Sequence, residues 1–197
     1  YFGLFSIVPI ATAFALLRPL VKSFEKTTIF TGALTVMILN GLWWIPGRLL
    51  DYLPPNGDPL LFYLALVNSF FLVSSVMILQ TIGAAIVADI VDEHEVHTGE
   101  RMDGVFFAAM GFSMKVPTGL GQFLGGVIIQ FAGLAAGAEP GDVPGDVLFK
   151  LGVIAGPIIS LSFILPGLLL TRFDLSRERH QELRDILKLR EVTPSED

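Results

Sequence analysis

The chain alternates long apolar runs with short polar ones. Five runs are long enough to cross a hydrocarbon layer of ~30 Å as helices, and together they contain a single charged side chain. They cover residues 1–17, 27–46, 60–88, 104–133 and 151–171. Continuous apolarity over such lengths, without period-2 alternation, predicts an all-α membrane protein with five transmembrane helices.

The polar stretches divide the chain into two predicted units. Connections at 18–26, 47–59, 89–103 and 134–150 separate the five runs of a transmembrane bundle over residues 1–171. Residues 172–197 form a charged tail whose spaced apolar residues favour an amphipathic helix along the membrane surface, with a solvated tail as the alternative. The chain opens inside an apolar run without the basic flank and cleavage site of a signal peptide, so we expect part of a longer protein.

Basic residues near the span ends indicate the orientation, because Lys and Arg resist translocation. One side contains Arg48 and Lys150. The other side contains Arg18, Lys22, Lys26, Arg101, Arg172, Arg177, Arg179, Arg184, Lys188 and Arg190. The second side is predicted to be cytoplasmic, which places the C-terminus in the cytoplasm.

Composition supports the membrane assignment and narrows the partners. Hydrophobic residues make up 52% of the chain and charged residues 16%, against roughly 25% charged in soluble domains. A net charge of -6 argues against nucleic acid, which requires clustered Lys and Arg. The absence of Cys excludes disulfides and thiolate metal sites. The lipid bilayer is therefore the expected partner.

Lys115 is the single ionisable residue in the fourth run. If Asp103 marks one membrane surface, a rise of ~1.5 Å per residue places Lys115 about 18 Å inward, where an ammonium costs at least ~2.5 kcal/mol. Such a residue requires a partner, and it indicates either a transport pathway or a structural ion pair between helices. Pro117 nearby predicts freed carbonyls, and the spacing of Gly121 and Gly125 predicts close approach of another helix.

Histidine and acidic residues within 89–103 raise the question of a metal site. His94 and His97 lack the His-Glu-x-x-His pattern of zinc hydrolases, and no further His is close in sequence. A solvated loop is therefore the preferred interpretation. Catalytic triads and Gly-rich phosphate loops are also missing, so we expect no cofactor, no bound metal and no enzymatic activity.

The residues from 88 to 115 carry a family pattern. Ala-Asp-x-Val-Asp-x-x-Glu is followed by Thr-Gly-x-Arg and by an apolar run bearing Lys, at Asp89, Asp92, Glu95, Arg101 and Lys115. This pattern resembles the glycoside-pentoside-hexuronide:cation symporters, the melibiose-carrier-like branch of the major facilitator superfamily. Residues 18–22 and 173–180 are similar to that family's loop and tail. The resemblance implies helices 8–12 of a twelve-helix carrier of the bacterial inner membrane, with the N-terminal half absent.

By this resemblance, Lys115 lies beside the cation and substrate sites, whose carboxylates come mainly from the missing half. A coupling Na⁺ or H⁺ would compete with the ammonium for those carboxylates, and this competition would bias the conformation. At the cytoplasmic ends of the third and fourth spans, an alternating carrier needs a gate of breakable contacts. The gate candidates are Arg18, Asp89, Asp92 and Arg101, with Arg18 expected to pair with Asp89; a solvated turn is the alternative.

The solute is less well defined. Sugar-carrying relatives place an aromatic residue and a Gln-Thr pair where this chain has Gln80, Met110 and Gly111. Polar residues that can face a central cavity are Asn40, Asn68, Gln80, Ser113, Thr118 and Gln122, each with a helix-to-helix hydrogen bond as the alternative. Trp43 and Trp44 are expected at the outer interface. Two functions remain: a cation-coupled carrier of a sugar or related small solute, and a non-transporting membrane sensor or scaffold.

Overall fold

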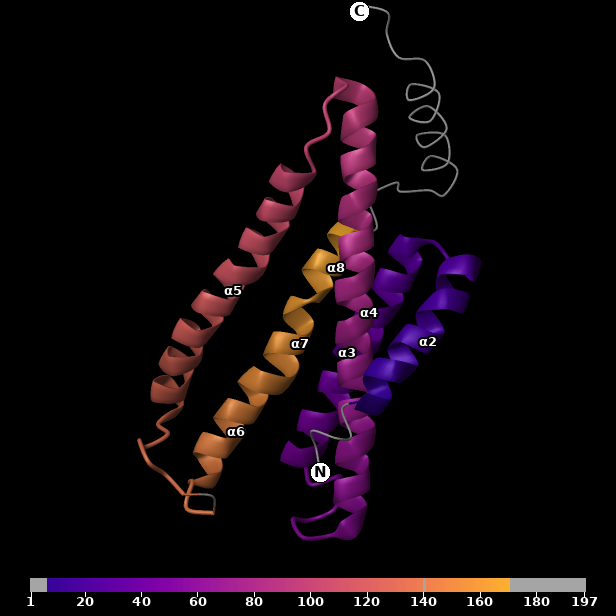
Figure 1. Ribbon diagram of the computed structural model, residues 1–197. Coiled ribbons are helices and arrows are strands. Elements are labelled where there is room, and N and C mark those ends of the chain that lie inside the picture. The colour runs from indigo at the N-terminus through magenta and orange to yellow at the C-terminus, as the bar shows by residue number, and fades with distance from the viewer. Residues whose placement is uncertain (1–6, 140, 171–197) are drawn as a thin grey trace, which may run out of the picture.

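The computed structural model describes residues 7–139 and 141–170, and this part of the chain contains helices and connections without strands (Figure 1). The long helices are α2 (Ile7–Ser23), α3 (Lys26–Leu49), α4 (Pro59–Thr98) and α5 (Asp103–Ala132). A last rod consists of α6 (Gly145–Val153), the π-helical segment η1 (Ile154–Ile158), α7 (Ile159–Ser162) and α8 (Ile164–Leu170). The predicted tail at 172–197 lies outside the described residues. The predicted all-α architecture is confirmed.

Helix α4 is far longer than its predicted span of 60–88. It begins where the Asp58 carboxylate caps the Leu60 amide at 2.8 Å, with Pro59 in the first turn. It ends at Gly99, whose φ of 77° suits glycine best. Its 40 residues span about 60 Å, twice the hydrocarbon thickness.

The predicted connection at 89–103 is therefore wrong in its first part. Residues 89–98 continue α4, and only residues 99–102 separate it from α5. No Gly or Pro occurs between 89 and 98. The backbone can thus continue in helical geometry beyond the apolar stretch, because charge alone does not end a helix.

The last rod begins at Gly145, six residues before the predicted start at 151. It changes to π-helical geometry at Ile154–Ile158, around Pro157. Proline lacks an amide hydrogen and its ring clashes with the carbonyl four residues earlier, so a wider turn relieves the clash. By contrast, α5 remains one assigned helix through Pro117.

Helices α2, α3 and α4 share a compact core. Leu17, Ile29, Ile82 and Ile86 pack together in its centre. Near the beginning of α2, the Ser74 hydroxyl of α4 donates to the Pro9 carbonyl at 3.2 Å. Pro9 itself is buried. Apolar contacts therefore hold the three helices together, and this hydrogen bond joins α2 to α4.

The last rod packs on α3 through glycines. A Cβ at Gly156 would lie 2.6 Å from the Ile45 Cβ, and one at Gly152 would lie 2.7 Å from a Leu49 methyl. The two backbones therefore approach closely through the small-x-x-x-small spacing. The glycines expected to play this role, Gly121 and Gly125 on α5, face open space in the described structure: a Cβ added at either would meet no heavy atom within 4 Å.

Helix α5 stands apart from the α2–α4 group, with the last rod between them (Figure 1). It contacts α4 and α6, and Ala132 is its one buried residue. By length and apolarity, α3, α4 and the rod Gly145–Leu170 can cross a membrane. Helix α5 is absent from that set because Lys115 and its glycines and glutamines lower its hydropathy, and α2 is described over only 17 residues. Membrane crossing by α2 and α5 therefore stays a prediction.

Candidate functional site

The Asp89 carboxylate lies at the junction of α3 and α4. The residue is 8% exposed, and both of its oxygens accept from the Lys26 ammonium, at 2.6 and 2.7 Å. The same ammonium lies 3.5 Å from the Ala85 carbonyl. Because Lys26 is the first residue of α3 and Asp89 lies in the last quarter of α4, this pair ties two helices together at one end of the bundle.

This arrangement corrects one prediction. Arg18 was expected to pair with Asp89, whereas the structure gives that carboxylate to Lys26. The reason is geometric: Lys26 begins the helix that packs directly on α4, and Arg18 is exposed on α2. From the sequence, Lys26 was counted only as a basic residue near a span end. Its position next to the predicted start of a helix, at residue 27, is the signal that could have indicated a structural role.

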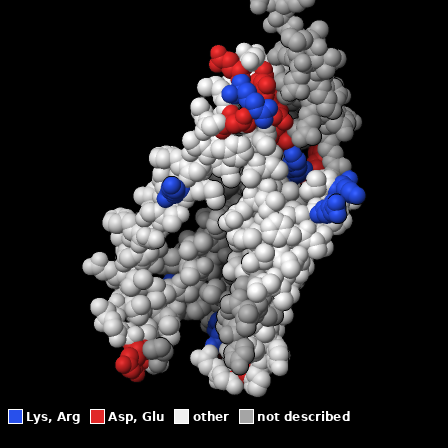
Figure 2. All heavy atoms as spheres, in the orientation of Figure 1, with Lys and Arg blue, Asp and Glu red and all other residues white. Residues whose placement is uncertain are grey.

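Arg101 gathers three carboxylates between α4 and α5. Its guanidinium bonds Asp103 at 2.7 Å and Glu95 at 2.9 Å, and it lies 3.7 Å from Asp92. Hydrogen bonding to Asp103, followed by the charges of Asp103 and Glu95, raises the pKa of Arg101 above its ordinary value. The two predicted gate residues Asp92 and Arg101 are thus brought together, at the charged end of the molecule seen in Figure 2.

The two histidines lie on α4 and not in a loop. The His97 ring nitrogen Nδ1 lies 2.8 Å from the Glu93 carbonyl, one turn earlier. The His94 ring packs on Phe106 of α5, with centroids 5.3 Å apart. That ring contact, together with the Arg101 cluster, joins the end of α4 to the beginning of α5.

Lys115 lies twelve residues into α5 and is exposed. In the part of the chain that the structure describes, no carboxylate pairs with it, whereas Lys26, Arg101 and Lys150 each pair with one. Its neighbours Ser113 and Gln122 are also exposed, and Thr118 donates to the Met114 carbonyl of its own helix. The described chain therefore presents this face of α5 without covering it.

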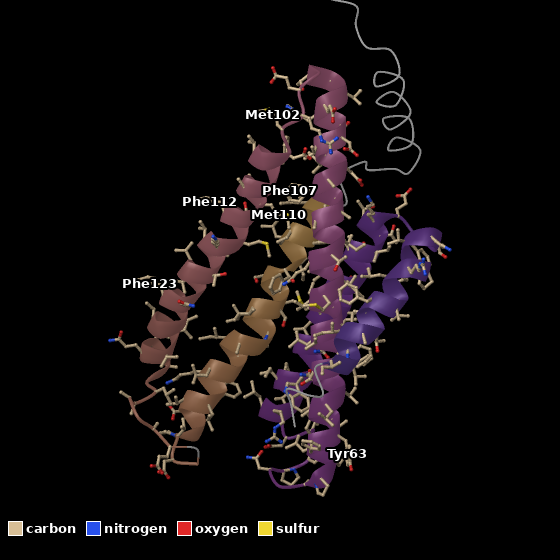
Figure 3. The ribbon with its side chains drawn as sticks, in the orientation of Figure 1. Tyr63, Met102, Phe107, Met110, Phe112 and Phe123 are labelled. Atoms are coloured by element: carbon tan, nitrogen blue, oxygen red, sulfur yellow. The ribbon has the colours of Figure 1, made fainter. Side chains whose placement is uncertain are left out.

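Large apolar side chains of α5 lie on two sides of the helix (Figure 3). Phe112 and Phe123 point away from the rest of the molecule and are 69% and 68% exposed (Figure 3). Met110 lies on the side of the last rod (Figure 3). Apolar surface on the outside of α5 is what a lipid-facing or partner-facing helix requires.

The remaining cavity candidates are Asn40, Asn68 and Gln80, and within the described part of the chain only the Asn40 side chain forms a hydrogen bond between helices. The Asn40 amide donates to the Asn68 carbonyl at 3.1 Å and accepts from the Trp43 indole at 3.0 Å, so it ties α3 to α4. The Asn68 side-chain oxygen is buried without a hydrogen-bond partner among the described residues. Gln80 is exposed on α4. Asn40 therefore follows the helix-to-helix alternative.

Comparison with known proteins decides the family. A family model described as "MFS/sugar transport protein" matches residues 1–177, where MFS denotes the major facilitator superfamily. The chain belongs to this family. The resemblance read from residues 88–115 is confirmed, and the family consists of transporters and not of enzymes. Multi-pass membrane localisation follows from the family and from the apolar helices.

Two curated relatives agree with this assignment. An uncharacterized symporter of Synechocystis sp., sll1374, is 30% identical over 172 residues, which cover 85% of this chain and 29% of that protein. A protein of Salmonella typhimurium named provisionally as a sulfoquinovose importer is 28% identical over 133 residues, 68% of this chain and 26% of that protein. The chain thus spans less than a third of either relative. No solved structure matches.

Proposed function

We propose that this chain is the C-terminal part of a secondary carrier that couples the movement of a sugar or related small solute to Na⁺ or H⁺. The observation that carries the proposal is Lys115, a cation on a membrane-length helix whose face the described chain leaves uncovered. An ammonium in that position gains most from carboxylates that another part of the carrier supplies. The similarity to two proteins named as a symporter and an importer supports the same class.

In this mechanism the coupling cation and Lys115 share the same carboxylates. When Na⁺ or H⁺ binds, the ammonium loses part of its partner, and the relative energies of the two access states change. The pairing carboxylates would come from the N-terminal half, as the resemblance to the symporter family implies. Ser113, Thr118 and Gln122, on the same helix, are the proposed cavity-lining residues, with Gln80 on α4.

We assign the cytoplasmic side to the end that holds the α2–α3 turn and the end of α4. The Lys26 to Asp89 contact brings these segments together, and Arg18, Lys22 and Arg101 lie at the same end. The excess of basic residues supports this orientation, with the C-terminus on the cytoplasmic side of a bacterial inner membrane. The exposed Arg101 cluster with Asp92 is the proposed gate at this end, because its solvated contacts can break in every cycle.

The test is gradient-driven uptake by the full-length protein. Vesicles carrying Lys115→Ala or Lys115→Gln should lose concentrative uptake across a sugar panel under imposed Na⁺ or proton gradients. Lys150→Gln is the matched control, because Lys150 pairs with Asp146 one turn away at the opposite end of the molecule. Undiminished accumulation by both Lys115 variants would refute the coupling role.

A non-transporting sensor or scaffold is the competing function. It predicts that wild-type protein accumulates no member of the panel under either gradient. In a non-transporting protein Lys115 needs no coupling partner. This function therefore also predicts that the apolar spans of the N-terminal half contain no acidic residue. Finding such residues, together with uptake, would favour the carrier.

A further inference from the structure

A cavity lies at the end of the molecule opposite the proposed gate. It has a volume of about 520 Å³ and is formed by the end of α3, the 50–58 connection and the beginning of α4. Its polar lining includes Arg48 and Asp58, and its apolar lining includes Trp44, Leu61, Phe62 and Ala65. This size falls within the range of ligand pockets, and the mixed lining suits an amphipathic occupant.

Two opposite charges in this cavity bond only neutral groups in the described structure. The Arg48 guanidinium donates to the Pro54 carbonyl and, at 2.6 Å, to the Asn56 amide oxygen. The Asp58 carboxylate accepts from the Leu60 backbone amide at 2.8 Å. No ion pair within the described ranges involves either side chain. Arginine has five N–H donors, so three remain after these two bonds.

Exposed aromatic residues near the α3–α4 connection indicate the level of this cavity in a bilayer. Trp43, Tyr52 and Tyr63 are 38%, 82% and 63% exposed, and Tyr63 lies near the α3–α4 connection in Figure 3. Exposed Trp and Tyr mark the headgroup level of a bilayer. From that level Leu61 and Ala65 continue along α4 toward the membrane interior.

We propose that this cavity binds the headgroup of a zwitterionic phospholipid with a primary ammonium, as in phosphatidylethanolamine. Arg48 binds the phosphate, Asp58 binds the ammonium, and the acyl chains follow the apolar lining on α4. Charge complementarity selects this occupant: an anionic headgroup would meet Asp58, and a lipid lacking an ammonium hydrogen would donate nothing to it. A small hydrophilic solute would leave the apolar part of the cavity wet.

The test measures the lipids retained by the full-length protein. Protein reconstituted into nanodiscs of mixed phosphatidylethanolamine, phosphatidylcholine and phosphatidylglycerol is released into detergent, and native mass spectrometry counts bound lipid. Wild type should retain phosphatidylethanolamine. Arg48→Gln should reduce retention about tenfold, the equivalent of ~1.4 kcal/mol, since a hydrogen bond between charged groups is among the stronger ones. Asp58→Asn keeps a capping side chain and should transfer the preference to phosphatidylglycerol.

Controls separate a specific site from general effects. Lys150→Gln and Asp146→Asn remove an ion pair at the same end of the molecule but outside the cavity, and should leave the lipid pattern unchanged. If Arg48→Gln unfolds the connection, Asp58→Asn alone still tests the exchange of preference. Unchanged lipid retention in Asp58→Asn, wild-type preference for phosphatidylglycerol, or competition by a free zwitterionic solute without bound lipid would overturn the proposal.

Discussion

Helices α3 and α5 are similar in sequence character and opposite in surroundings. Each is an apolar helix of membrane length with one lysine, an internal proline and several glycines. On α3 the lysine binds a buried carboxylate, and the last rod packs closely along the helix. On α5 the lysine is exposed, and glycines 119–126 face open space in the described chain.

The difference shows which interactions this chain completes by itself. Among the described residues, α3 supplies the partner of the buried Asp89 carboxylate, and it packs closely against the glycines of the last rod. Helix α5 is joined to them near its two ends, through the His94 to Phe106 contact and through Gly133, which lies against Val147. Its central face therefore has the properties of an interface for the remainder of a carrier.

The largest expected effect comes from replacing a closely packed glycine of the last rod, compared with the same replacement in α5. Gly156→Ala places a methyl group 2.6 Å from the Ile45 Cβ, so the backbones must separate, which costs about 1–3 kcal/mol. Gly121→Ala meets nothing within the described chain and should be neutral or slightly stabilising. Thermal unfolding in detergent measures both variants.

Uptake by the full-length protein then sharpens the contrast between the two glycines. If α5 packs on another part of the carrier, Gly121→Leu should impair uptake while the unfolding midpoint of the bundle stays close to wild type. Equal destabilisation by Gly121→Ala and Gly156→Ala would show that α5 packs as tightly as the last rod and would contradict the comparison.

The second prediction concerns the two lysines. Asp89→Asn should destabilise the protein by about 1–3 kcal/mol, because the half-buried Lys26 ammonium loses its partner. The double variant Lys26→Met with Asp89→Leu should recover much of that loss, since an apolar pair of similar size removes both charges. Lys115→Met should leave the unfolding midpoint unchanged. Denaturation of the four proteins in one detergent decides the matter, and an unrescued double variant would argue against the pair.

The sequence predicted the helices well and their partners poorly. Apolar runs located α3 and α5 within a few residues, because burial in lipid requires continuous apolarity. The extension of α4 to Thr98 was missed, because residues 89–98 are rich in charged side chains and lack the continuous apolarity that marked the other helices. Lys26 was missed for a different reason: which cation reaches Asp89 depends on the packing of α3 against α4, and this is a property of the fold.

The glycine spacing illustrates the same limit. The pattern at Gly121 and Gly125 was expected to allow close helix approach, and the pair Gly152 and Gly156, with identical spacing, does so in the described structure. A Gly-x-x-x-Gly spacing shows that another helix can approach closely. Which helix does so depends on the topology of the fold. Lys115 was located by its isolation in sequence, but no carboxylate among the described residues pairs with it, so its partner stays a prediction.

The third prediction tests the polar contact between α3 and α4. Asn40→Leu removes the hydrogen bonds to the Asn68 carbonyl and from the Trp43 indole. Interhelical hydrogen bonds in membranes average about 0.6 kcal/mol, so a loss of ~1 kcal/mol is expected. Trp43→Phe, which removes only the indole donor, should account for less than half of it. The unfolding midpoints are compared with that of Gln80→Leu, an exposed polar residue on α4.

The smallest effect is expected at Arg101, which is the contact proposed to open. Arg101→Gln should shift the unfolding midpoint less than Asn40→Leu does, and raising salt from about 50 mM to about 500 mM should abolish that difference, because the cluster is solvated. Acidic neighbours raise the pKa of Arg101, so its contribution is present below the ordinary pKa of arginine and is lost only when the pH rises through the raised pKa. The titration of Arg101 itself therefore adds no slope between about pH 5 and 8. A strong, salt-independent loss of stability in Arg101→Gln would identify the cluster as a fixed structural element, which would leave the gate to other residues.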